Sequence, residues 1–389
     1  MNICHITHNY PRFPGDHAGF FIEDLTKGLA GHLSAGKNKI SVITPHQQGL
    51  PTCQNYCGID IHRVKYARHE NIAYTGKMHH FLMNPVYWNQ FIGLFEKTYL
   101  KIKEIADQFD ILHFHWIVPS GIIGYFIQHP CKIISIHGTD LRIMEKYPFN
   151  LLMKKILIRY NTVIPVSTYL KKILEAHTDK LNIEVLPIIG NLDNFISSPS
   201  SQISQPLQLI TVSRLSKQKN LSVVLQAVKL LHDSGVQVNY TIAGDGEYKN
   251  NLIEQTNKLG ISDLVKFTGM ISHNLIPELL KGFDIFVLPS LNEGFGLSVL
   301  EARLSGKLVI GSNSGGLLDL IKDHSTGIFF NPRDPSRLAE LIKSVISSNS
   351  KYINITTNSF NEAKKKYSYT NQVKQWLEIY SRILHNPDF

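Results

Sequence analysis

The chain of 389 residues is 43% hydrophobic and 18% charged, a composition typical of a folded, core-forming protein and not of a disordered one. At roughly 150 residues per domain, this length predicts two or three domains. The 40 Lys and Arg exceed the 31 Asp and Glu, which gives a formal net charge of +9. The excess is spread evenly and forms no long basic block, so nucleic acid is not expected as a partner.

Cysteine usage and hydropathy indicate in which cellular compartment the protein is expected. The four cysteines are few for a secreted disulfide scaffold and lack the paired spacings of a zinc site. The first residues lack a basic segment and reach Asn9 and Pro11 too soon for a signal peptide. The most apolar stretch, 111–127, contains histidines, glycines and a proline, which fit a buried strand and helix better than a membrane span. We therefore expect a cytoplasmic protein.

Short apolar runs alternate with amphipathic segments, the pattern of βαβ units with parallel sheets. In the first half, strands are expected at residues 2–7, 40–44, 111–115, 132–136 and 162–166. Helices are expected between them at residues 20–33 and 151–160.

A second series follows a linker at 196–206, which is rich in Ser and Pro and carries no charge. Its strands are expected at 207–213, 238–243, 265–268, 285–288 and 307–310, and its helices at 222–234, 248–259, 276–281 and 335–347. We expect an α/β chain with one doubly wound, Rossmann-like domain over residues 1–200, another over 201–369, and a helix within 370–389. Ligands of such folds bind at the carboxyl ends of the strands, so a cleft between the domains is the expected site.

The strongest cluster runs from Glu293 to Glu301 with the sequence EGFGLSVLE. A buried strand ends just before it, a glycine-containing turn follows, and a helix begins near Leu297. At 1.5 Å per residue, Glu301 lies about 6 Å along that helix. The two carboxylates could hold hydroxyls of two sugar units on either side of a diphosphate, while the backbone amides at the helix start face an anion.

Two cations follow the first strand after the linker. Arg214 stands at the carboxyl end of that strand, and Lys219 lies near the start of the next helix. Fixed cations there suit a diphosphate leaving group, whose charge grows as its bond to the sugar breaks. Lys217, between them, is expected to be solvated.

Other loops follow strands in both halves. Gly244-Asp245-Gly246 is expected to form a structural turn that borders the nucleotide, because glycines permit a tight turn. The loop 15–20 precedes a helix, and small residues such as Gly19 let the backbone approach a diphosphate there. His137 closes a strand, where it could bond a sugar hydroxyl or manage a proton.

Histidines are unevenly distributed, since 14 of the 18 lie before residue 200. His113 and His115 share one face of an expected strand, but the chain has neither an H-E-x-x-H pattern nor a D-x-D acid pair. Core or acceptor contacts are the favoured interpretation, and no metal site is expected.

Together these residues resemble glycosyltransferase family 4 (glycosyl transferases group 1), which are retaining enzymes of the GT-B fold, over nearly the whole length. The most specific mark is the E-x7-E element that encloses Gly294-Phe295-Gly296. The turns at 314–319 and 326–327 resemble those that follow in the family. The resemblance also implies that the helix within 370–389 crosses back to the N-terminal domain, so that the domain division is not contiguous in sequence. The chain departs from the pattern at 17–19, with one glycine where two are usual, and at Asp319, where glutamate is usual.

The resemblance implies a role for each matched residue. Arg214 and Lys219 would bind the donor diphosphate, Glu293 would orient the donor sugar, and Glu301 would hold the ribose. The implied catalytic set is His137, Arg214, Lys219 and Glu293. The implied donor-binding set is Gly19, Arg214, Lys219, Gly269, Glu293, Gly294, Phe295, Gly296, Leu297 and Glu301. The implied reaction is metal-independent hexosyl transfer with retention from a nucleotide-diphosphate sugar, expected to be UDP-linked, with no cofactor.

Features that could bind the acceptor are expected in the N-terminal half of the chain. Residues 78–99 are rich in aromatics, and Lys154, Lys155 and Arg159 lie beside apolar residues in 151–160. These segments could lie on an anionic membrane and meet a lipid-linked sugar, although a packed core and a solvated helix face explain the same residues. By the resemblance, the expected setting is bacterial surface polysaccharide assembly (O-antigen of lipopolysaccharide, capsule or exopolysaccharide) on a polyprenyl diphosphate, with the enzyme peripheral at the inner face of the plasma membrane. A sugar-nucleotide epimerase of the same fold and a non-catalytic nucleotide-sugar binding protein stay open as alternatives.

Overall fold

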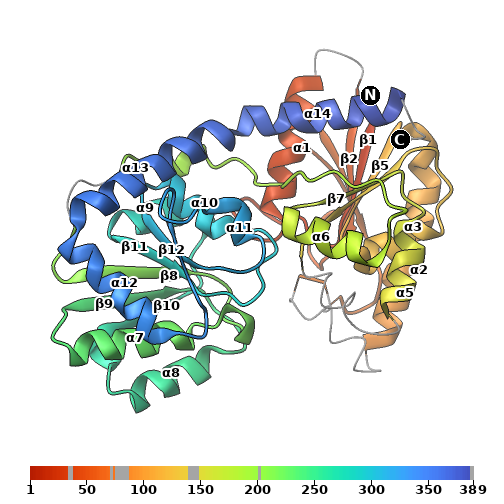
Figure 1. Ribbon diagram of the computed structural model, residues 1–389. Coiled ribbons are helices and arrows are strands. Elements are labelled where there is room, and N and C mark those ends of the chain that lie inside the picture. Colours follow the sequence, from red (N-terminus) through yellow and green to blue (C-terminus); the bar gives the residue numbers. More distant parts are fainter. Residues whose placement is uncertain (34–37, 71–72, 75–86, 139–148, 200–202, 386–389) are drawn as a thin grey trace. The chain divides into compact units, whose positions relative to one another are not determined.

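The computed structural model describes residues 1–389 except for 34–37, 71–72, 75–86, 139–148, 200–202 and 386–389. The chain forms two compact units (Figure 1). Unit 1 comprises Met1–Asn191 and Tyr369–Phe389, and unit 2 comprises Leu192–Ser368. Each unit is an α/β domain with its own sheet, so the predicted fold class of two Rossmann-like domains is confirmed.

Unit 1 is built on a seven-stranded sheet in which all neighbours pair in parallel except the antiparallel β3 and β4. In spatial order the strands are β3 (Cys53–Tyr56), β4 (Ile59–Val64), β2 (Ile40–Pro45), β1 (Ile3–Ile6), β5 (Ile111–His115), β6 (Lys132–Ile136) and β7 (Thr162–Pro165). The chain reverses its direction of travel across the sheet between β1 and β5, and ligands of doubly wound folds bind at such a point.

The helices of unit 1 include one from the far end of the chain. They are α1 (Phe20–Leu33), α2 (Trp88–Ile105), α3 (Ile122–Tyr125), α5 (Phe149–Leu157), α6 (Thr168–His177) and α14 (Tyr369–His385). Helix α14 packs on α1, where the Tyr369 hydroxyl donates to the Asp24 carbonyl at 2.6 Å. Trp376 and Tyr380 of α14 are fully buried in the same core as Ile3 of β1, so the last helix is part of the unit 1 core.

Unit 2 is built on a six-stranded, fully parallel sheet. In spatial order the strands are β10 (Val265–Gly269), β9 (Val238–Ala243), β8 (Leu207–Val212), β11 (Ile285–Leu288), β12 (Leu308–Ser312) and β13 (Ile328–Phe330). The helices are α7 (Ser222–Asp233), α8 (Lys249–Lys258), α9 (Ile276–Lys281), α10 (Leu297–Leu304), α11 (Leu317–Leu320), α12 (Pro335–Ser347) and α13 (Asn349–Lys366). Here the reversal lies between β8 and β11.

Every strand expected from an apolar run is present with its ends within two residues of the prediction. Strands β3, β4 and β13 were not expected. Strand β3 is a polar edge strand, β4 carries Asp60, His62 and Arg63 between its apolar positions, and β13 has only three residues. Helix α13 was not expected either, since most of its residues are polar and its lysines cluster in the last turn.

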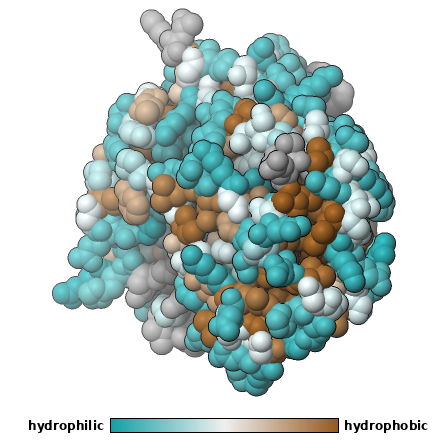
Figure 2. Space-filling view, turned by 90° about the vertical axis from the view of Figure 1, so that its left-hand side faces the viewer, coloured by the Kyte–Doolittle hydropathy of each residue, from teal (hydrophilic) through white to brown (hydrophobic). Residues whose placement is uncertain are grey.

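Exposed apolar side chains occur on both units. On unit 2 they include Leu230, Ile253 and Ile346, and Figure 2 shows apolar side chains gathered in patches between polar ones on one face of the molecule. Among the described residues, none of the helices combines the length and apolar character that a membrane span requires.

Candidate functional site

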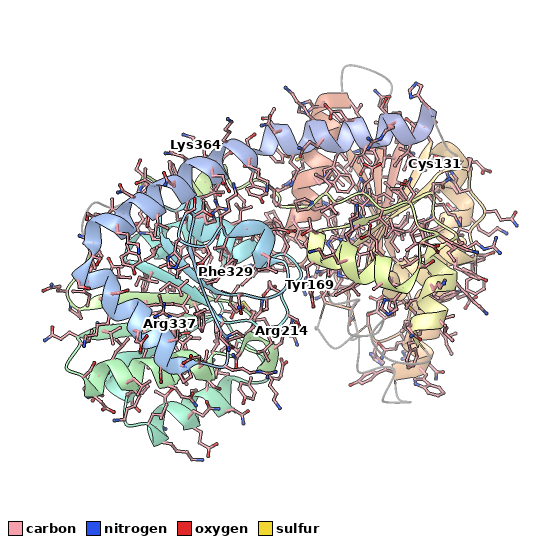
Figure 3. The ribbon with its side chains drawn as sticks, viewed as in Figure 1. Cys131, Tyr169, Arg214, Phe329, Arg337 and Lys364 are labelled. Carbon is pink, nitrogen blue, oxygen red and sulfur yellow. The ribbon has the colours of Figure 1, made fainter. Side chains whose placement is uncertain are left out.

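In unit 2 the predicted polar residues follow β8 and β11, the adjacent strands at which the sheet order reverses. Arg214 comes two residues after β8 (labelled in Figure 3), and Lys219 ends the short helix η6 (Lys217–Lys219). Glu293 lies between β11 and α10. Because the carboxyl ends of parallel strands share one edge of the sheet, these loops are neighbours.

Lys219 and Glu293 form an ion pair at this edge, with the Lys219 ammonium 2.6 Å from Glu293 Oε2. Both side chains are largely shielded, at 18% and 15% exposed. Two further bonds hold their loops together, since Leu291 N–H donates to the Gln218 carbonyl at 3.0 Å and Asn220 Nδ2 donates to the Pro289 carbonyl at 3.3 Å. The fold therefore fixes a cation and a carboxylate at the switch point, the place between β8 and β11 where the strand order of the unit 2 sheet reverses.

Two glycines support the backbone of Glu293. Gly316 N–H donates to the Glu293 carbonyl at 2.7 Å. A Cβ at Gly315, whose φ is +63°, would lie 2.5 Å from the same carbonyl oxygen, so only glycine permits this approach. The predicted turn at 314–319 is thus the support of the Glu293 loop.

Arg214 is more exposed than Lys219 and pairs with Glu247, its Nη2 lying 3.1 Å from Glu247 Oε2. Its loop is fixed by the glycine turn after β9. A Cβ at Gly244, whose φ is +137°, would lie 1.9 Å from the Ser213 carbonyl oxygen. Gly244 therefore has a structural role here, holding the turn against the loop that carries Arg214.

Glu301 is buried on α10. Its carboxylate oxygen Oε1 is hydrogen-bonded to His273 Nε2 at a distance of 2.8 Å. His273 opens the short helix η8 (His273–Leu275), and its ring packs on Phe195 with 5.2 Å between centroids. Sequence reasoning missed His273. The only signal was that a carboxylate expected inside a helix needs a partner, and 28 residues separate the two.

The remaining predicted residues of unit 2 lie on the neighbouring loops. Gly296, with φ of +97°, is the N-cap of α10 and precedes Leu297. Gly269 ends β10, and its carbonyl accepts from Gly244 N–H at 2.8 Å. Phe295 is 9% exposed and packs edge-to-face on Tyr367, which makes it a packing residue in this structure. The Gly294 carbonyl is closely approached by Gly316.

Gly19 and His137 lie in unit 1, Gly19 directly before α1 in the connection from β1, and His137 directly after β6. A Cβ at Gly19, whose φ is +66°, would lie 2.0 Å from the Asn9 carbonyl oxygen, so the close approach that this glycine permits is to its own loop. His137 packs on Trp116 with 4.2 Å between ring centroids. Burial, together with the positive charge that His8 can carry, lowers the pKa of His137 to about 3, so the ring is neutral at physiological pH.

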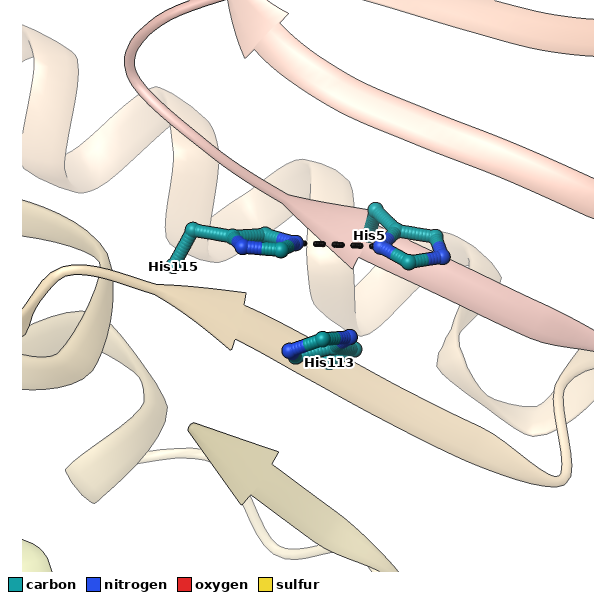
Figure 4. Close-up of side chains that lie close together, drawn as sticks. All are labelled: His5, His113 and His115. Atoms are coloured by element: carbon teal, nitrogen blue, oxygen red, sulfur yellow. Dashed lines mark hydrogen bonds between the residues drawn. The ribbon is translucent and has the colours of Figure 1, made fainter. Parts of the chain in front are cut away.

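His137 is hydrogen-bonded to a cluster of buried histidines, three of which are drawn in Figure 4. His5 Nδ1 lies 3.0 Å from His115 Nε2, and His115 Nδ1 lies 3.3 Å from His137 Nε2. His113, on β5, bonds the Tyr380 hydroxyl through Nδ1 and the Ser135 hydroxyl through Nε2, both at 2.8 Å. Burial lowers the pKa of each of these imidazoles, so the cluster is neutral.

Within the described part of the chain, His5, His113 and His115 are the group whose donor atoms lie close enough together to consider a metal ion. Five of their six ring nitrogens, however, are engaged with one another, with His137 and with the hydroxyls of Ser135 and Tyr380, while His5 Nε2 has no hydrogen-bond partner among the described residues. The His113 and His115 rings lie with their centroids 4.1 Å apart and their planes tilted by 31°. The arrangement is that of a hydrogen-bonded network.

Comparison with known proteins finds a family model that matches part of the chain and relatives along its whole length. Residues 194–366 match the family described as Glycosyl transferases group 1. Over 98% of both chains, the sequence is 28% identical to an uncharacterized glycosyltransferase of Methanocaldococcus jannaschii.

Solved structures share the architecture at low sequence identity. Sucrose-phosphate synthase from Thermosynechococcus elongatus superposes with a TM-score of 0.82 at 16% identity over 99% of both chains. HepE of Anabaena, solved in complex with UDP-glucose, superposes with a TM-score of 0.74 at 19% identity over 98% of this chain and 100% of that one. At such identities the likeness shows the fold, which is that of the GT-B glycosyltransferases.

Proposed function

We propose that this chain of the GT-B fold is a glycosyltransferase of group 1, in keeping with the family match over residues 194–366 and with the relative from Methanocaldococcus jannaschii. In the proposed reaction it transfers a hexosyl unit from a UDP-sugar to a lipid-linked saccharide, with retention at the anomeric carbon and without a metal ion. The narrower assignment to family 4 stays a prediction. The single observation that carries the proposal is the shielded pair of Lys219 and Glu293 at the switch point of the unit 2 sheet.

The chemistry of this edge suits a sugar diphosphate. An ammonium group carries three donors, so Lys219 can bond Glu293 and a diphosphate oxygen at once. Arg214 adds a planar fork that binds phosphate oxygens in pairs, and it is exposed enough to turn from Glu247 to a ligand. These two cations would supply the positive charge that a metal ion supplies at other diphosphate sites.

The proposed reaction is a front-face transfer. The bond between the anomeric carbon and the diphosphate oxygen breaks, the bond to the acceptor oxygen forms on the same face, and the acceptor proton passes to the leaving diphosphate. Lys219 and Arg214 stabilise the charge that develops on the leaving group, where fixed electrostatics have their largest effect. Glu293 orients the donor sugar, Glu301 holds the ribose, and His137 bonds a sugar oxygen as a neutral imidazole.

The choice of UDP has its support in the HepE structure, a neighbour of the same fold that was solved with UDP-glucose. Its test is a thermal-unfolding series with UDP, GDP, ADP, CDP and their sugar conjugates, each with and without EDTA. At 100 times its Kd, a ligand adds about 2.7 kcal/mol, which raises the Tm by several degrees. We expect a rise with UDP and a UDP-sugar that EDTA leaves unchanged.

Other outcomes of this series would contradict the proposal in different ways. A rise that EDTA abolishes would remove metal independence, and a rise with another base would remove UDP. No rise with any nucleotide would remove the donor site. Product analysis of a bound donor without acceptor separates transfer from its alternatives, because an epimerase would release a new sugar nucleotide and a binding protein would change nothing.

For the acceptor, the supporting surface is helix α5 and the turn after it. Four apolar side chains there are 42–53% exposed, namely Phe149, Leu151, Leu152 and Ile158. Unit 2 also exposes apolar side chains, so exposure alone decides little. What distinguishes α5 is that Lys154, Lys155 and Arg159 lie among them while the helix itself contains no acidic residue. Apolar side chains with cations and no acids fit an anionic lipid surface.

The aromatic segment of the same prediction is described only in part. Residues 78–82 lie outside the described residues, while Trp88 on α2 is 53% exposed. The proposed setting is the assembly of a bacterial surface polysaccharide on a polyprenyl diphosphate, with the enzyme held at the inner membrane face by α5.

We expect Lys154→Gln with Lys155→Gln to weaken binding to vesicles of phosphatidylcholine and phosphatidylglycerol about 30-fold, since each lysine near such a surface contributes about 1 kcal/mol. The measurement is co-sedimentation at several salt concentrations. Lys171→Gln with Lys172→Gln, on α6 of the same unit, is the matched control and should bind as the unaltered protein does. Equal binding by both double variants would overturn the membrane-facing role of α5.

A further inference from the structure

Three histidines of unit 1 form a hydrogen-bonded chain that ends at His137. It begins at His5 in β1, passes through His115 at the end of β5, and reaches His137 just after β6, with ring nitrogens 3.0 and 3.3 Å apart. The first link is drawn as a dashed line in Figure 4. The chain crosses the point at which the order of the unit 1 sheet reverses.

The electrostatics keep the chain neutral. His5 and His115 are fully buried, and burial lowers the pKa of both rings, for His5 to about 3. A neutral imidazole has one N–H donor and one lone pair. Each link needs one donor and one acceptor, so the proton position on one ring fixes the position on the next.

Only two arrangements satisfy both links. In the first, all three protons are on Nδ1, His5 donates to His115, and His115 donates to His137 Nε2. In the second, all three are on Nε2, and the direction of donation is reversed. The two differ at the ends of the chain, because the first leaves His137 with a protonated Nδ1 and the second leaves it with a protonated Nε2.

The inner end favours the first arrangement. His5 Nε2 is buried and has no hydrogen-bond partner among the described residues. In the second arrangement this atom would be a buried N–H donor without an acceptor, whereas in the first it is an unused lone pair. Buried donors without acceptors are rarer in proteins than under-used acceptors, in keeping with the cost of losing a donor's bond to water.

We propose that His115 and His5 are positioning residues that hold the proton of His137 on Nδ1 and so make its Nδ1 a hydrogen-bond donor to the reacting sugar. This inference rests on the proposed function for its consequence, but the proton position itself is a property of the unliganded protein. His137 then binds a sugar oxygen and takes no proton from the acceptor, which agrees with the leaving diphosphate as the proton's destination.

The test is a long-range ¹H–¹⁵N correlation spectrum of protein labelled with ¹⁵N-histidine, in which protonated and unprotonated ring nitrogens resonate far apart. Single His→Gln variants assign the signals. We expect Nδ1 to be protonated in His5, His115 and His137 of the unaltered protein. A protonated Nε2 at His137 would overturn the proposal, as would a change in these rings on addition of one equivalent of Zn²⁺, which would mark a metal site.

His115→Phe provides the second measurement, because phenylalanine keeps a ring beside His113 and removes both nitrogens. We expect His137 to lose its single proton position and transfer to fall about tenfold, the loss of one neutral hydrogen bond, with KM for the donor nearly unchanged. Tyr380→Phe is the control, since it removes the bond to His113 and leaves the chain of three rings intact. An unchanged His137 signal in folded His115→Phe would overturn the proposal.

The two measurements separate this inference from the proposed function. The spectrum needs no donor and no turnover, so it decides the proton position even if His115→Phe does not fold. A protein that showed the expected spectrum but bound no nucleotide sugar would leave the proton position standing and remove the proposed reaction.

Discussion

Replacing Lys219 by alanine is expected to lower the rate of sugar transfer about 100- to 1,000-fold, the range for removing one fixed group that stabilises developing charge. The Lys219 ammonium lies 2.6 Å from the Glu293 carboxylate and is largely shielded from water. Shielding strengthens its interaction with a leaving diphosphate. The variant also removes the ammonium that pairs with Glu293, so donor binding should weaken together with turnover. The measurement is the initial rate of transfer as a function of donor concentration.

Lys217→Ala is the matched control for this prediction, because Lys217 belongs to the same short helix η6 and was expected to be solvated. We expect its transfer rate to stay within about twofold of the unaltered protein, as for surface changes generally. Far-ultraviolet circular dichroism and thermal unfolding of both variants check that the fold is retained. Near-normal turnover by folded Lys219→Ala would remove Lys219 from the proposed diphosphate site and leave the E-x7-E element without its cation.

The placement of the site residues at one edge of the unit 2 sheet could be predicted from sequence because they lie on two short, continuous segments. Glu293, Gly296 and Glu301 lie on one strand–turn–helix segment, and Arg214 and Lys219 lie on another. Each segment has its own hydrophobic pattern, and the rule that carboxyl ends of parallel strands share an edge joins the two. The pairing of Lys219 with Glu293, which are 74 positions apart, needed the sheet order that places β8 beside β11.

The histidine chain could not be predicted, since it depends on the register between strands. His5 lies opposite His113 because β1 and β5 pair with Ile3 opposite Ile111. A shift by one residue would turn these side chains to the other face of the sheet. The sequence showed only that His113 and His115 share a face, so it favoured core contacts and could not join them to His5 and His137. His273 could not be predicted either, because its contact with Glu301 depends on how η8 and α10 pack in the folded protein.

Arg303 is a buried residue of unit 2 whose loss should cost much stability. Its side chain is fully buried on α10, two residues after Glu301. Its guanidinium donates to the Ser359 hydroxyl at 2.9 Å, to the Ser359 carbonyl at 3.0 Å and to the Leu320 carbonyl. It also lies 3.3 Å from Glu362. Burial lowers the pKa of Arg303 and Glu362 opposes that change, so the charge is maintained by its partners.

We expect Arg303→Met to lower the free energy of unfolding by about 3 kcal/mol, because it leaves two buried carbonyls and a hydroxyl without their donor. The measurement is urea unfolding followed by circular dichroism. Lys322→Met is the control, since Lys322 contacts the same Glu362 but is 70% exposed, and exposed pairs contribute under about 1 kcal/mol. Arg303 joins α10 to α11 and α13, so the same variant should also weaken donor binding at Glu293 and Glu301, which α10 positions. Equal unfolding midpoints for the two variants would mean that α10 is held by its apolar face alone.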